Sequence, residues 1–115
     1  MYANTEYELG TTSSYYSALS YFDRLLELID DDYEDLPMIG YKMGDIYREL
    51  GIYKYAYEAL IIADDLFEND ANASDYQKAL NKVKLGEVYI KLDSLDLGQR
   101  SIENAVKLSN DYYIS

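Results

Sequence analysis

The amino-acid sequence predicts an all-α fold of antiparallel helical hairpins, and three observations support this expectation. The chain of 115 residues contains one proline and six scattered glycines, a composition that favours helices over sheets. Apolar residues recur every three or four positions over long stretches, which is the spacing of one face of a helix. Two segments also repeat at a fixed offset, which is typical of stacked helical units.

The first two periodic stretches are separated by an acidic segment. Apolar side chains recur from Tyr15 to Ile29, and residues 30–32, all aspartates, then leave the pattern and predict a solvated loop. The second stretch runs from Ile39 to Leu50. Pro37 suits the first turn of this helix, and Asp35 just upstream is a candidate N-cap.

Three further stretches follow, joined by short connections. Gly51 is a natural left-handed stop for the second helix. Ser74, with Gln77 three residues later, matches a capping box at the start of the fourth helix. Connections this short force neighbouring helices to be antiparallel. The three stretches are Tyr53–Phe67, Leu80–Leu92 and Leu95–Leu108.

Two segments, Tyr41–Ala63 and Val83–Ala105, align without a gap. Gly86 lies 42 positions after Gly44 and occupies the matching position. Small residues at such points let one helix approach another closely, while larger side chains fill the space between them. We therefore expect stacked helix pairs rather than a simple bundle. The other matched pairs are Tyr47 and Tyr89, Leu50 and Leu92, Ala56 and Gly98, Leu60 and Ile102, and Ala63 and Ala105.

The order of residues in both segments resembles the tetratricopeptide repeat (TPR). An apolar residue precedes glycine, tyrosine follows three positions later, and a small, a large apolar and a second small residue complete the pattern. The spacing departs from the family's usual period of about 34 residues and resembles its longer-period variants. The family's closing proline is also absent from both copies. The copies are Met43, Gly44, Tyr47, Ala56, Leu60 and Ala63, then Leu85, Gly86, Tyr89, Gly98, Ile102 and Ala105.

The resemblance implies a right-handed superhelix of stacked hairpins in a single domain over residues 1–115. Within it we expect a partial first repeat at residues 2–32, a second repeat at 37–70 and a third at 74–110. We interpret the chain as the repeat segment of a longer protein. Repeat arrays need polar terminal helices for solubility, so we also expect self-association or an extra helix to cover an exposed terminal helix.

The charge balance restricts the classes of partner. Acidic residues outnumber basic ones, 22 to 10, and the formal net charge is −12. This charge repels phosphate, so we expect no nucleic-acid partner, and no uncharged stretch reaches the roughly 20 residues needed for direct membrane insertion. A basic peptide would be attracted, although the simpler explanation is that the charge keeps the module soluble. The absence of cysteine leaves the compartment open, with the cytoplasm slightly favoured.

The sequence predicts no enzyme, and we assign no catalytic residue, cofactor site or metal site. Neither histidine nor cysteine is present. The chain therefore lacks the commonest general base and the imidazole and thiolate groups that most often bind transition metals. The acidic segment that begins at Asp30 does not fit a calcium loop, because Asp35 stands where glycine is needed and Tyr41 where a bidentate glutamate is needed. A hydrolase that uses paired carboxylates is a third hypothesis, distinguished by turnover that is lost on neutralising one carboxylate.

The leading hypothesis is a non-catalytic module that binds a protein or peptide in a concave groove lined by the first helix of each hairpin. In this groove Tyr41 is either a binding anchor or a packing residue between units. Asp45 and Glu87 occupy matching positions and either bind a basic partner or stay solvated. Some family members bind acidic chaperone C-termini with lysines and asparagines, and the matching positions here hold Met38, Tyr41, Asp45, Leu80, Val83 and Glu87 instead. The residues implied by the resemblance are Met38, Tyr41, Asp45, Arg48 and Glu49, and Leu80, Val83, Glu87, Ile90 and Lys91.

A second functional hypothesis belongs to a different class. Longer-period arrays of this type occur as sensory segments of bacterial signalling proteins, either peptide receptors or modules that precede a catalytic output domain. This alternative comes from the resemblance alone, and the domains that flank the segment in its parent gene would distinguish it.

Overall fold

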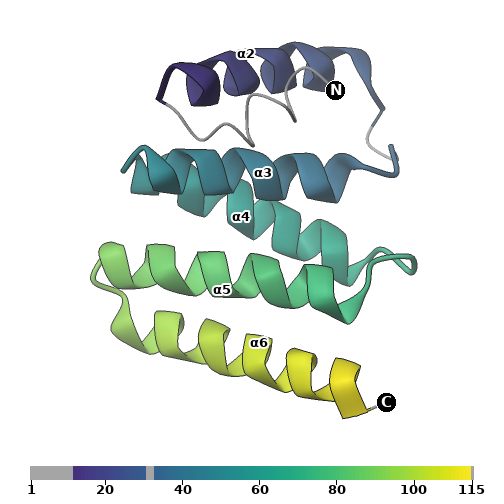
Figure 1. Cartoon of the computed structure of the whole chain (residues 1–115), viewed down its shortest axis with the longest axis vertical. Helices are drawn as coiled ribbons and strands as arrows, with labels where there is room; N and C mark the ends of the chain where they lie inside the picture. The colour runs from purple at the N-terminus through teal and green to yellow at the C-terminus, as the bar shows by residue number, and fades with distance from the viewer. Residues whose placement is uncertain (1–11, 31–32, 115) are drawn as a thin grey trace.

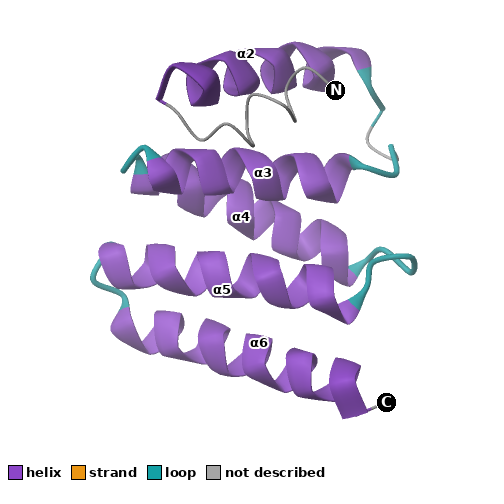
Figure 2. Ribbon diagram, viewed as in Figure 1, coloured by secondary structure: helices purple, strands orange, loops and turns teal. Residues whose placement is uncertain are grey.

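A computed structural model describes residues 12–30 and 33–114, without the side chains of Thr12 and of residues 110–114. Residues 2–11 and 31–32 of the expected partial first repeat lie outside these residues. The described part of the chain contains helices and no strand, so the predicted all-α class is confirmed (Figures 1 and 2). The helices are α2 (Thr12–Leu28), α3 (Leu36–Glu49), α4 (Tyr53–Glu68), α5 (Asp75–Lys91) and α6 (Leu95–Ile114).

The helices are stacked in chain order, and each runs antiparallel to the next (Figure 1). Helix α3 packs on α4, α4 on α5 and α5 on α6, while α2 contacts α3 along a smaller area. The short connections predicted between the last four helices account for this order, because a short connection places each helix beside the next one. The helices α3 and α4 form one hairpin and α5 and α6 form another.

The turns of these two hairpins have the same geometry. Gly51 ends α3 with φ of 77°, and Asp93, 42 positions later, ends α5 with φ of 63°. Both residues are in the left-handed region that closes a helix C-terminus. The matching hydrogen bonds run from Ile52 N to Tyr47 O at 2.9 Å and from Ser94 N to Tyr89 O at 2.8 Å.

Close approach at matched glycines holds each hairpin together. A Cβ atom added to Gly44 would lie 2.5 Å from Cγ of Leu60, and one added to Gly86 would lie 2.7 Å from Cγ1 of Ile102. Both distances are far below van der Waals contact, so any larger residue would force the facing side chain or the second helix to shift. The four small residues predicted to let the helices approach are all buried: Gly44, Ala56, Gly86 and Gly98.

The apolar core forms two clusters, one between α2 and α3 and one among α3, α4 and α5. Helix α3 contributes to both, with opposite faces, which explains why its apolar pattern is broad. The α2–α3 cluster contains Ala18, Leu19, Phe22, Ile39, Met43 and Ile46, and the α3–α5 cluster contains Tyr41, Ala56, Leu60, Ala63, Phe67, Leu85 and Val88.

The two predicted helix starts differ in their capping. The hydroxyl of Ser74 accepts from Gln77 N at 3.1 Å and the Gln77 side chain accepts from Ser74 N at 3.1 Å, so the capping box is confirmed. Asp35 is the N-cap residue of α3, with Pro37 in the first turn, but the Asp35 side chain makes no capping hydrogen bond. Its backbone, at φ −91° and ψ 4°, lies outside the extended region from which a cap side chain reaches back.

Candidate binding face

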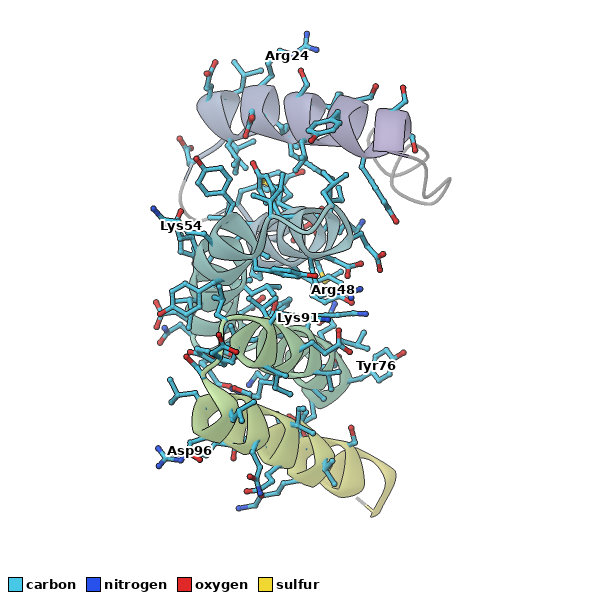
Figure 3. All side chains as sticks on the ribbon, turned by 90° about the vertical axis from the view of Figure 1, so that its left-hand side faces the viewer. Arg24, Arg48, Lys54, Tyr76, Lys91 and Asp96 are labelled. Atoms are coloured by element: carbon cyan, nitrogen blue, oxygen red, sulfur yellow. The ribbon has the colours of Figure 1, made fainter. Side chains whose placement is uncertain are left out.

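The first helices of the two hairpins, α3 and α5, place charged side chains beside one another. We call the surface formed by Asp45, Arg48 and Glu49 of α3 with Lys84 and Glu87 of α5 the α3–α5 face. Figure 3 shows Arg48 on the same edge of the stack as Tyr76 and on the opposite edge from Lys54. Four of these five residues belong to the predicted groove, so the structure brings them together.

Arg48 is the centre of this face. Its Nε and Nη2 atoms donate to Oδ1 of Asp45 at 3.1 and 2.8 Å, and Nη2 also donates to Oε1 of Glu49 at 2.6 Å. Its Nη1 atom lies 3.2 Å from Oε2 of Glu87 on the other hairpin. Arg48 therefore links the two hairpins electrostatically, and one guanidinium contacts all three acidic residues of the face.

Lys84 adds a second cation that the sequence analysis did not include. Its Nζ atom lies 3.7 Å from Oδ1 of Asp45. The position of Lys84 three residues before Glu87 places both on one side of α5, which is the signal that identifies it. With three acidic and two basic residues, the face carries one net negative charge.

The pKa of Arg48 reflects these contacts. Partial burial by itself lowers the pKa, but the hydrogen bond to Asp45 and the charges of Asp45, Glu87 and Glu49 outweigh it and raise the pKa above the usual value. The guanidinium is therefore held in its charged form, and Asp45 is held as its acceptor.

The two acidic residues that we expect to bind a basic partner, Asp45 and Glu87, differ in their exposure to solvent. Asp45 is 8% exposed and is enclosed by its two cationic neighbours. The side chain of Glu87 is 43% exposed and that of Glu49 is 44% exposed. A cationic partner would therefore reach Glu87 and Glu49 before Asp45.

Tyr41 lies in the core cluster between the hairpins, with only 9% of its surface exposed. Burial, with a smaller contribution from the charge of Asp45, raises its pKa to about 12. Of the two roles considered for Tyr41, packing between units is the one its position supplies. A role as an anchor for a partner stays a prediction.

The remaining predicted groove residues are divided between two places. Met38 and Leu80 are half-buried and pack against the same core cluster as Tyr41, and Val83 is also half-buried. Ile90 and Lys91 are exposed at the end of α5, where Ile90 adjoins α6 rather than α3. Ile90 therefore belongs to a different surface.

Within residues 12–30 and 33–114, no helix combines the length and apolar character required to cross a bilayer. The same part of the chain holds no group of three or more acidic side chains arranged to bind a metal ion. Comparisons of the chain with protein-family models, with curated proteins and with solved structures gave no match.

Proposed function

We propose that this chain is a TPR-type repeat module, non-catalytic, that binds a protein or peptide on the α3–α5 face. The observation that supports this best is the equivalence of the two hairpins. They place Asp45 and Glu87, 42 positions apart, on neighbouring first helices that share Arg48. A surface repeated in this way suits an extended partner, because each hairpin supplies a similar contact. Stacking in the same sense would generate the right-handed superhelix of the family.

The proposed partner is a segment that carries lysine or arginine. Glu49 and Glu87 are half-exposed, and each contacts only Arg48 among the described cations. A cation of the partner can bind these carboxylates on their open side without displacing Arg48. The net charge of −12 adds a longer-range attraction that weakens as salt screens it.

A peptide array probed at low and moderate salt would test this function and identify a ligand. For the best peptide, Glu49→Gln and Glu87→Gln should each weaken binding by about threefold, since exposed ion pairs contribute about 0.2–1 kcal/mol. Glu58→Gln, at an exposed carboxylate on α4, is the matched control and should leave affinity unchanged. Equal losses in all three variants would mean that net charge, and not this face, determines binding.

A further inference from the structure

An apolar groove lies along one side of the second hairpin, where the end of α5 meets the first half of α6. Ile90 is 41% exposed and Leu95 is 63% exposed, so large apolar side chains face solvent there. The lining residues are Ile90, Leu95, Gln99, Ile102 and Glu103. We call this surface the α5–α6 groove.

Residues 42 positions earlier form the surface of the first hairpin on which α5 packs. The ring of Tyr57 contacts that of Tyr89 of α5 edge-on, with centroids 5.6 Å apart. The carbonyl oxygen of Leu60 accepts from Nδ2 of the buried Asn81 of α5 at 3.0 Å. The full set of counterparts is Arg48, Tyr53, Tyr57, Leu60 and Ile61, in the order of the five lining residues.

We propose that the α5–α6 groove binds an amphipathic helix of a partner protein in the position that α5 takes on the first hairpin. The two hairpins share their turn geometry and their glycine contacts, so the second hairpin offers the same shape of surface. On the first hairpin this surface is covered. On the second hairpin no described residue covers it.

Two charged contacts of the first hairpin have apolar counterparts on the second, one at Ile90 in the groove and one at Val106 farther along α6. On the first hairpin, Arg48 pairs with Glu87 and Asp64 pairs with Lys82 at 2.9 Å, so α5 is held at two points by ion pairs. The matching residues of the second hairpin are apolar: Ile90 takes the place of Arg48 and Val106, 54% exposed, takes the place of Asp64. A charged residue of the partner placed opposite either one would lose hydration without gaining an ion pair. The partner helix is therefore apolar at both points.

Two lining residues of the groove are polar where the first hairpin has apolar or aromatic residues. Gln99 takes the place of Tyr57, and Glu103 takes the place of Ile61. Gln99 Nε2 donates to Glu103 Oε1 at 3.0 Å, and no described lysine or arginine pairs with Glu103. A lysine or arginine of the partner helix would complement this carboxylate. The partner is thus an amphipathic helix with apolar residues at the positions that match Lys82 and Glu87 of α5 and a cation at the position that matches Tyr89.

Two synthetic peptides test the preference of the groove. The first has the sequence of residues 74–92 and reproduces α5 with its flanking caps. The second carries Lys82→Leu, Glu87→Leu and Tyr89→Lys, which makes its two ion-pairing points apolar and places a cation toward Gln99 and Glu103. We expect the full chain to bind the altered peptide at least about tenfold more tightly, a difference of roughly 1.4 kcal/mol.

The protein variant Ile90→Arg with Val106→Asp restores the two charges of the first hairpin. This double variant should bind the unaltered peptide more tightly than the altered one. Leu97→Asp, at an exposed site on another side of α6, is the control and should leave the preference for the altered peptide unchanged. All three positions are exposed, and circular dichroism would check that each variant folds. Binding of neither peptide, or the same preference in the double variant, would overturn the proposal. Self-association that Val106→Asp abolishes would also overturn it, because the occupant would then be a second copy.

This groove is separate from the α3–α5 face. Substitutions at Glu49 and Glu87 test the proposed peptide-binding function, and substitutions at Ile90 and Val106 test the groove. Either proposal can therefore fail while the other holds.

Discussion

At the scale of single residues, Tyr41 connects burial to a measurable dependence on pH. Its phenol lies in the core cluster between the hairpins, and its pKa is raised from 10.0 to about 12, by burial first and by the charge of Asp45 second. A group whose pKa is higher in the folded state binds its proton more tightly there than in the unfolded chain. Its contribution to stability is complete below pH 10 and is lost as the pH rises from about 10 to about 12.

We therefore expect the free energy of unfolding to fall above pH 10, and Tyr41→Phe to reduce that fall by at most about 3 kcal/mol. Burial raises the pKa values of Tyr47 and Tyr89 in the same direction, so part of the alkaline loss should persist in the variant. Urea denaturation at a series of pH values would measure this. Tyr16→Phe, at an exposed tyrosine, is the control. If the free energy of unfolding fell equally above pH 10 in the wild type and in Tyr41→Phe, the raised pKa of Tyr41 would not be the cause.

The two left-handed turn residues give a second prediction. Gly51 has φ of 77° and nothing lies within 4 Å of an added Cβ, so any cost of substitution comes from the backbone conformation alone. Gly51→Ala should destabilise the fold by about 1–2 kcal/mol, the penalty of a left-handed non-glycine residue. Asp93→Gly should have the opposite sign and a smaller size, because aspartate tolerates this region better than most residues. Thermal unfolding of both variants would check the pair, and a stabilising Gly51→Ala would refute it.

Residue-level prediction from the sequence succeeds where spacing alone determines the outcome. Gly44 and Gly86 are identified by their matching positions, and both are buried against the second helix of their hairpins. Lys84 is missed because its interaction with Asp45 joins two helices that are distant in sequence. The pairing of Glu87 with Arg48 is missed for the same reason. Periodicity places a residue on a face of its helix, but it does not identify the neighbour across the interface.

At the scale of helices, the two N-caps provide a matched comparison. Ser74 makes the capping hydrogen bonds of α5, whereas Asp35 at the start of α3 makes none. Ser74→Ala should therefore destabilise the fold by about 1 kcal/mol. Asp35→Ala should change the free energy of unfolding by only a few tenths of a kcal/mol. Denaturant titrations of both variants test this, and an equal cost for the two would mean that the observed capping geometry is not the cause.

Apolar periodicity and capping residues together place the starts of the last three helices. The apolar stretch from Tyr53 starts at the first residue of α4, and Leu95 likewise begins α6. Helix α5 starts at Asp75, five residues before the apolar stretch from Leu80, because the capping box and not hydrophobic burial begins it. Asn81 of this helix is a polar residue buried among apolar ones. Its Nδ2 atom donates to the carbonyl oxygen of Leu60 on α4, and this hydrogen bond allows the side chain to be buried.

At the scale of the whole molecule, the described chain is a stack in which the second hairpin repeats the first 42 positions later. The matched turns, the glycine contacts and the starts of α4 and α6 all follow from this one offset. The all-α class was predictable from the apolar periodicity, and the antiparallel order was predictable because every connection between the last four helices is short. The different surfaces of the two hairpins were not predictable from the repeat. Arg48 and Ile90 occupy equivalent positions, but Arg48 forms an ion pair with Glu87 whereas Ile90 lines an apolar groove.

Both functional proposals depend on the equivalence of the two hairpins, and nuclear Overhauser effects in solution test it most directly. We predict contacts from the Hα protons of Gly44 to the methyl groups of Leu60 and from those of Gly86 to the methyl groups of Ile102, together with contacts between the rings of Tyr57 and Tyr89. If either glycine contact were absent, or if the Tyr57 ring met α6 instead of α5, the hairpins would not be stacked equivalents and the account would be contradicted.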